Sequence, residues 1–289
     1  MIEQLQGQAA GIKATQTQLK ALYGHCCGTL PDLSDEPPQN LIDLLIKMLK
    51  GIYRTRHMPA VIDTGVTEYF AQEFYKAVVE GYGASLLTVD FTTPDYLVLR
   101  HLEENVYQFA AAKNYQQLKA VTQALVDDEG KLRSFSEFKR ASFEVLNEQV
   151  TSYMEAEYNL AVAGGQMAAT WTRIQENKET LPLLKYITVG DDRVRPEHAE
   201  LEGVIRPVDD DFWDMYYPPN GWNCRCDVIQ LSDGTETPLD DIVTPANMPA
   251  LFKTNLAKHG LVFPPNHPYY IGIPDKVMEQ AKKLLHKRG

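Results

Sequence analysis

The sequence predicts an α+β protein with a predominantly α-helical body and a small β-sheet in its C-terminal half. Apolar residues recur at helical spacing through much of residues 41–173, which indicates amphipathic helices packed on a core. The spacing changes after Leu181-Pro182, where short runs rich in β-branched residues alternate with turns. At 289 residues and 44% hydrophobic composition, the chain is long enough to bury at least one substantial core.

Residues 1–95 are predicted to form a helical N-terminal arm or adaptor region. Residues 1–34 are rich in glutamine and only weakly patterned. The sequence Asp35-Glu36-Pro37-Pro38 then indicates a break before a helix that begins near Asn40.

Helical spacing is clearest in two windows, residues 41–48 and 66–78. Turn-forming residues interrupt the pattern at residues 81–94 and again at residues 127–130. We therefore expect separate helices on either side of each interruption.

A long helix is expected from about residue 135 to residue 173, within a second domain of residues 96–231. Its apolar stripe includes Leu146, Val150, Met154, Tyr158 and Val162. Small residues around Gly164-Gly165 predict close packing against a neighbouring backbone, with a kink allowed at the two glycines.

Three short runs predict the strands of the sheet: residues 184–189, 204–205 and 226–231. Residues 232–289 are richer in proline and asparagine, and we expect a C-terminal tail that ends in a helix over residues 275–287.

The charge and the cysteine pattern limit the classes of function. A formal net charge of −11 argues against a general polyphosphate binder, although Lys131, Arg133, Lys139 and Arg140 form a local basic stretch that could contact DNA. No secretory signal or membrane-spanning segment is recognisable, so no membrane partner is expected.

The four cysteines fall in two close pairs, which favours a reducing cytoplasm over a disulfide framework. The first pair, Cys26-Cys27, is interpreted as structural.

The second pair belongs to a candidate metal site. His198, Cys224 and Cys226 are imidazole and thiolate ligands of the kind that Zn²⁺ favours, usually as a tetrahedral set of four. A fourth ligand is missing, and nearby aspartates, water or a substrate are candidates for it. Alternatively, His198 makes an ordinary hydrogen bond and the thiols pack as small hydrophobic groups.

A zinc-dependent hydrolase or deaminase is the enzymatic alternative, with Glu197 or Glu200 as the proton carrier beside His198. The Pro-Cys-x-x-Cys half of the deaminase signature is absent. The acidic residues 209–211 and Asp214 could hold a hard cation, but they are more typical of a solvated turn in which Asp211 caps a helix. We find no phosphate-binding loop and no nucleophile elbow, so no catalytic residue is predicted and the chain is not expected to be an enzyme.

Four ordered segments, residues 186–198, 201–203, 212–213 and 218–226, resemble the core of the phage Mu protein F-like head morphogenesis family. The clear resemblance covers about residues 135–231. The motif residues are Asp191, Arg193, Arg195, His198, Trp213, Pro218, Pro219, Cys224, Arg225 and Cys226.

The resemblance implies a minor capsid component of tailed-phage or prophage heads, present in few copies and associated with the portal protein during assembly. It places the chain in the virion head, and in the host cytoplasm while heads assemble, with other capsid components as further partners. Some family members contact DNA and affect its packaging or delivery. A DNA-binding internal head protein is therefore the second alternative function.

Overall fold

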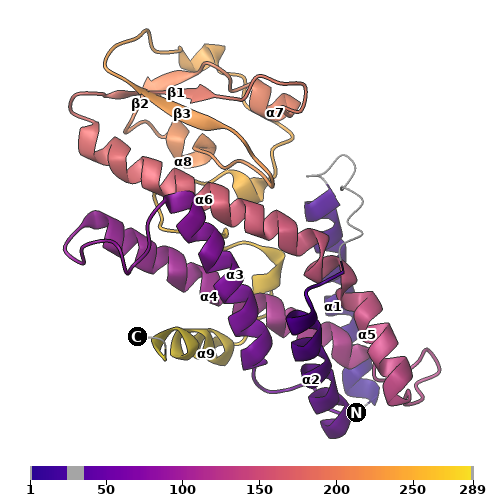
Figure 1. The fold of residues 1–289 in the computed structure, drawn as a ribbon. Coiled ribbons are helices and arrows are strands. Elements are labelled where there is room, and N and C mark those ends of the chain that lie inside the picture. The colour runs from indigo at the N-terminus through magenta and orange to yellow at the C-terminus, as the bar shows by residue number, and fades with distance from the viewer. Residues whose placement is uncertain (1, 25–35, 288–289) are drawn as a thin grey trace. The chain divides into compact units, whose positions relative to one another are not determined.

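The computed structural model describes residues 2–24, of which 2–11 by their backbone only, and residues 36–287. It is mostly helical and carries a three-stranded antiparallel sheet in its C-terminal half, which confirms the predicted α+β class (Figure 1). Cys26 and Cys27, interpreted as a structural pair, lie outside the described residues.

The elements follow one another in a simple order. The long helices are α1 (Ile2–Gly24), α2 (Gln39–Thr55), α3 (Thr64–Tyr82), α4 (Pro94–Gln123), α5 (Phe135–Val150), α6 (Ser152–Asn177) and α9 (Asp275–His286). The strands are β1 (Leu183–Ile187), β2 (Ile205–Pro207) and β3 (Asp227–Leu231). Short helices are α7 (Pro196–Ala199) and α8 (Phe212–Tyr216), with 3₁₀ turns η1 (Leu239–Asp241), η2 (Ala250–Phe252) and η3 (Pro268–Tyr270). The helix expected near Asn40, the interruptions after α3 and α4, the three strands and the final helix are all confirmed to within a few residues.

The chain divides into two compact units that interleave along the sequence. The first comprises Met1–Glu73, Val106–Ala156 and His267–Gly289, and the second comprises Phe74–Asn105 and Glu157–Asn266. We expected three consecutive domains, over residues 1–95, 96–231 and 232–289. The two units are defined by spatial contacts and do not test this expectation, which stays a prediction.

The core of the first unit follows the helical periodicity of the sequence. α2 is strongly amphipathic and buries Leu41, Leu45 and Leu49 completely. α5 begins with a capping box, in which Ser134 and Glu137 satisfy each other's backbone N–H groups. It buries Phe138, whose ring stacks on Tyr53 of α2 with 5.7 Å between centroids. Apolar burial therefore organises this unit.

The single helix expected over residues 135–173 is wrong, because two helices, α5 and α6, occupy this stretch. The chain leaves helical geometry at Thr151, with φ −119° and ψ −102°. The Thr151 hydroxyl donates to the carbonyl of Asn147 at 2.7 Å. A β-branched residue that bonds the preceding turn through its side chain weakens helix continuation at this point.

Close backbone packing around Gly165 is confirmed in the second unit, where α3 and α6 touch. A Cβ atom at Gly165 would overlap the carbonyl oxygen of Val78, and one at Gly81 would overlap that of Val162. α6 continues through Gly164 and Gly165 as one helix to Asn177. Gly81 and Gly165 thus allow α3 and α6 to cross so closely that no side chain fits at either position.

The sheet has the order β2-β1-β3, with β1 antiparallel to both neighbours. α6 runs along the sheet with α8 nearby (Figure 1). The side chain of Gln230 in β3 donates to the carbonyls of Ile174 and Leu181 at 3.0 and 2.8 Å, and Tyr217 donates to Met167 at 3.0 Å. The bond to Ile174 thus ties β3 to α6, and the bond to Met167 ties the residue after α8 to the same helix.

None of the helices in residues 2–24 and 36–287 combines the length and the apolar character that crossing a bilayer requires.

Candidate metal centre

His198 is positioned by the His198 loop, residues 188–203, which follows β1. The loop turns at Gly190, whose φ of +70° lies in the left-handed region that favours glycine. It then enters α7, which starts with Pro196 in its first turn. The backbone N–H of His198 donates to the carbonyl of Arg195 at 3.0 Å, and the residue is only 3% exposed. The imidazole is therefore held inside the unit.

The two thiols are positioned by the cysteine loop, residues 218–226, which leads into β3. Asn223 has a φ of +51°, a left-handed conformation that asparagine tolerates better than most residues. Asn159 of α6 donates to its side-chain oxygen at 3.0 Å. The backbone N–H of Cys224 donates to the carbonyl of Gly221 at 3.3 Å. These contacts hold the turn that carries both sulfurs.

The side chains of His198, Cys224 and Cys226 converge on one point. The Nδ1 atom of His198 lies 3.3 Å from the Cys226 sulfur and 3.7 Å from the Cys224 sulfur. All three ligand atoms lie within 4.8 Å of one another. A tetrahedral zinc ion, with its usual bond lengths to sulfur and nitrogen, places ligand atoms roughly 3.5–3.8 Å apart. The three atoms are thus close to metal-binding geometry.

The surroundings affect the two thiols differently. The pKa of Cys224 is lowered well below its ordinary value, mainly by a hydrogen bond from Cys226 and also by His198, against the effect of burial. The pKa of Cys226 is raised, because this thiol shares its proton with Cys224 and is itself largely buried. The pair therefore favours one thiolate, which is the form of cysteine that binds metals.

Polar contacts join the two loops beside the sulfurs. Arg225 donates to both carboxylate oxygens of Asp191 at 2.7 and 2.8 Å, and Arg193 donates to the same carboxylate at 3.3 Å. The Arg225 guanidinium is the main reason that the pKa of Asp191 is lowered. Arg195 donates to the carbonyl of Trp222 at 2.5 Å. The loops are therefore tied together in two places.

Two hollows border the sulfurs. One of about 40 Å³ is lined by residues of both loops, including Arg195, His198, Cys224 and Cys226. It exceeds the roughly 10–15 Å³ that a single water requires. The other, of about 630 Å³, lies between α6 and the cysteine loop and also reaches both sulfurs. The centre is buried but has solvent-sized space at its side.

The segment that contains this centre matches a known family. The family model described as Phage Mu protein F like protein matches residues 115–229, from α4 to β3, with all three ligand residues inside the match. The chain contains a Mu F-like domain. The resemblance predicted over residues 135–231 is confirmed. The family match begins earlier than predicted, at residue 115 within α4.

Two curated relatives match shorter stretches of the chain. Capsid assembly protein F of Escherichia phage Mu is 41% identical over 75 residues, which are 26% of this chain and 17% of that protein. The Mu-like prophage FluMu F protein of Haemophilus influenzae is 42% identical over 66 residues, 23% of this chain and 16% of that protein. The matched stretches span about a sixth of these relatives. No solved structure matches the chain.

Most of the predicted motif residues of the Mu F-like domain lie at the candidate metal centre. This group comprises Asp191, Arg193, Arg195, His198, Cys224, Arg225 and Cys226. Trp213 does not belong to it: the indole is fully buried, packs edge-to-face on Phe212 with 4.8 Å between centroids, and donates to the Arg206 carbonyl at 3.4 Å. Pro218 and Pro219, joined by a cis peptide, begin the cysteine loop.

Three further residues adjoin the centre; they lie within the motif segments but were not predicted as site residues. The Tyr186 hydroxyl of β1 donates to the Asn220 side chain at 3.0 Å. Burial, and then the nearby Cys224, raise the pKa of Tyr186 well above its ordinary value. A Cβ atom at Gly221 would lie 3.0 Å from Arg195 and 3.7 Å from Nε2 of His198. The alternation of β1 signals that Tyr186 is buried, but nothing in the sequence tells which groups its hydroxyl meets.

The geometry gives no support to the deaminase-like pairing of His198 with Glu200. Glu200 follows α7 and is exposed. Across the described parts of the chain, the group of side chains that could hold a metal contains no carboxylate.

The acidic residues near α8 are engaged individually rather than gathered around a cation. Asp209 pairs with Lys178 at 3.1 Å, and Asp214 pairs with Lys258 at 2.5 Å. Asp210 pairs with Arg206 and accepts from the backbone N–H of Phe212 at 2.8 Å. The capping role expected of Asp211 is thus wrong, because its neighbour Asp210 makes the bond and the Asp211 side chain does not.

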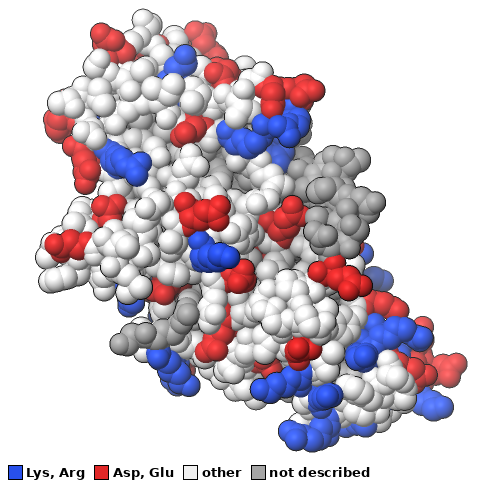
Figure 2. Space-filling model, in the orientation of Figure 1, with Lys and Arg blue, Asp and Glu red and all other residues white. Residues whose placement is uncertain are grey.

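Three residues of the basic stretch, Lys131, Lys139 and Arg140, are exposed. Arg133 is turned inward and donates to the carbonyls of Ala124 and Val126. Lys139 and Arg140 are exposed on α5, where Arg140 faces Glu144 at 4.0 Å. On the face drawn in Figure 2, Lys and Arg are interspersed with Asp and Glu over the described surface.

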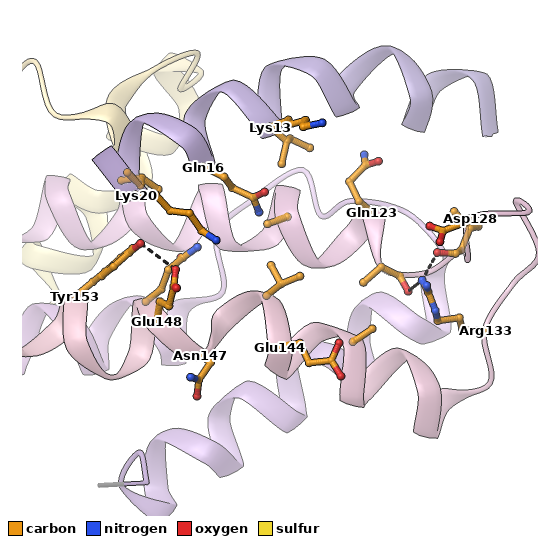
Figure 3. A pocket seen from close by; sticks show the side chains of 18 residues that line it. Lys13, Gln16, Lys20, Gln123, Asp128, Arg133, Glu144, Asn147, Glu148 and Tyr153 are labelled. Carbon is orange, nitrogen blue, oxygen red and sulfur yellow. Dashed lines mark hydrogen bonds between the residues drawn. The ribbon is translucent and has the colours of Figure 1, made fainter. Parts of the chain in front are cut away.

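A separate hollow of about 740 Å³ lies in the first unit, where α1 and α5 face each other near the end of α4 (Figure 3). Lys13 and Lys20 of α1 line one side, and Glu144 and Glu148 of α5 line the other. Glu148 accepts from Tyr153 at 3.0 Å. Charged groups of both signs therefore line this hollow.

Proposed function

We propose that this chain is a minor component of a phage or prophage head that acts in capsid assembly and contacts the portal protein. The Mu F-like domain over residues 115–229 carries the proposal, together with a relative that is named as a capsid assembly protein. Because the matched stretches span only a part of those relatives, the role of the whole protein is an inference. The expected location is the virion head and, during assembly, the host cytoplasm.

The polar contacts around the centre support a structural role. Its polar groups are used to join the His198 loop to the cysteine loop, through Arg225 with Asp191 and through Arg195 with Trp222. Among the described residues, the side chains that could hold a metal are His198, Cys224 and Cys226, and none of them is a carboxylate. We therefore propose that the centre shapes a surface for assembly and that the chain is not an enzyme.

Co-purification tests the portal contact. The full chain is co-expressed with a tagged portal protein encoded in the same phage or prophage genome, and the portal is isolated at low and at moderate salt. We expect the chain to be retained with the portal and to be absent when the tag is carried by the major capsid protein alone. Loss of the chain at both salt concentrations would overturn the portal contact.

Assembled heads test the wider role. Mass spectrometry of purified virions should detect the chain at few copies per head, and disruption of its gene should reduce the yield of filled heads. A chain absent from heads, with normal head yield after gene disruption, would contradict a role in assembly. Contact with DNA stays a separate prediction, tested by retardation of duplex DNA that weakens steeply with added salt.

A further inference from the structure

We propose that His198, Cys224 and Cys226 bind one Zn²⁺ ion, and that a water molecule in the adjoining 40 Å³ cavity is its fourth ligand. This inference goes beyond the assembly role, because it concerns the isolated chain and needs no partner. It assigns a metal and a coordination number to the centre.

The ligand atoms and their spacing select zinc. Two sulfurs and one imidazole nitrogen are soft or borderline ligands, which favour Zn²⁺ over the oxygen-seeking Mg²⁺ and Ca²⁺. The separations of 3.3 and 3.7 Å between Nδ1 and the sulfurs bracket those around a tetrahedral zinc ion. Coordination through Nδ1 leaves the proton of the neutral imidazole on Nε2, which lies on the side of Gly221.

Burial and polar contacts hold the three ligands in place. His198 and Cys224 are 3% and 8% exposed, so neither side chain has to be recruited from solvent. The bidentate pair of Arg225 with Asp191 and the bond from Arg195 to Trp222 fix the two loops on which the ligands stand. Supporting bonds of this kind orient the ligands of a metal site.

A fourth protein ligand does not converge with the other three within residues 12–24 and 36–287, whose side chains are described. The Tyr186 hydroxyl, which also lies within hydrogen-bonding reach of Cys226, donates to the side-chain oxygen of Asn220. The small cavity between the loops borders all three ligands and has room for a water. Three protein ligands with one water leave one exchangeable position on the metal.

Titration of the metal-free, reduced full chain with Co²⁺ and Zn²⁺ tests this proposal. We expect one equivalent of Co²⁺ to give the strong visible bands of a tetrahedral ion and the sulfur-to-metal charge transfer of two thiolates. One equivalent of Zn²⁺ should displace it. Azide should alter the Co²⁺ spectrum because it replaces the water.

Matched variants separate these ligands from the other side chains. His198→Ala, Cys224→Ser and Cys226→Ser should each lose stoichiometric binding, and each cysteine variant should lose part of the charge-transfer intensity. The double variant Cys26→Ser/Cys27→Ser and the variant Glu200→Gln should bind as the parent chain does. The parent chain and these controls keep the test decisive if a ligand variant fails to fold.

Several results would overturn the proposal. The parent chain could bind no metal at one equivalent, or the binding signal could survive in Cys224→Ser and Cys226→Ser. Alternatively, Cys224 and Cys226 could form a disulfide instead of binding the supplied zinc. A tetrahedral Co²⁺ spectrum that azide leaves unchanged would overturn the water ligand. Portal binding is measured separately, so failure of one proposal leaves the other open to its own test.

Discussion

The helical core of the first unit and the two loops of the candidate metal centre are held together by different forces. α2 and α5 bury whole apolar side chains such as Leu45 and Phe138, each of which contributes about 1.5–3 kcal/mol by leaving water. The His198 loop and the cysteine loop are joined to each other by directional contacts between charged and polar groups. The first region should therefore respond to side-chain volume, and the second to metal and pH.

The largest effect is expected in the helical core. Phe138→Ala removes a fully buried ring that stacks on Tyr53, and it should lower the free energy of unfolding by about 3–5 kcal/mol. Urea denaturation measures the loss. The control Phe91→Ala, at a residue that is 75% exposed, should change the free energy of unfolding by less than about 0.5 kcal/mol. Equal losses in both variants would break the comparison.

The crossing of α3 and α6 gives a second test with adjacent residues. Gly165→Ala should cost about 1–3 kcal/mol, because its Cβ atom would overlap the Val78 carbonyl. Gly164→Ala should be tolerated, since its Cβ atom would lie 3.5 Å from Val262, an ordinary contact. Thermal and urea unfolding of the two variants decide the matter. A Gly165→Ala variant as stable as the parent would contradict the close crossing.

The start of α5 is a smaller test of local structure. Ser134→Ala removes the side-chain half of the capping box and should lower the free energy of unfolding by about 1 kcal/mol. Ser134→Asp keeps an oxygen that can accept the backbone N–H, so it should retain most of the stability. If the aspartate variant loses as much as the alanine variant, the cap does not stabilise this helix.

The smallest effect on stability is expected at Asp191, on the surface of the metal centre. Its folded-state pKa is depressed by Arg225, so its contribution is present above the ordinary value of 3.8 and is lost as the pH falls below it. Asp191→Asn should lower the melting temperature slightly at pH 7, and the difference should vanish in acid. Asp192→Asn is the matched control, and a pH-independent difference at Asp191 would argue against the ion pair.

Periodicity predicted the helical part of the fold well, because one property, apolar burial, repeats along the chain. It failed at Thr151, where a single side-chain bond to the Asn147 carbonyl divides an otherwise continuous pattern. The small strands were predicted by their β-branched residues and the turns between them. The two interleaved units were not foreseen, since they depend on contacts between residues far apart in the sequence.

The candidate site was predicted in part. The ligand types of His198, Cys224 and Cys226 are visible in the sequence, but their meeting depends on loop conformation. That conformation rests on the left-handed turn at Asn223 and on the Asn159 bond to it, which no spacing rule reveals. The start of α8 is a similar case. The backbone N–H of Phe212 is bonded by Asp210 and not by Asp211, and the sequence does not tell which of two adjacent carboxylates faces it.

Hydrogen exchange with and without zinc is the most direct measurement of the difference between the two regions. Adding one equivalent of Zn²⁺ to the metal-free chain should slow exchange in residues 188–203 and 218–226, including the amides of His198 and Cys224, which bond within their loops. Exchange in α2 and α5 should stay unchanged. Equal protection throughout the chain, or none in the two loops, would contradict the account.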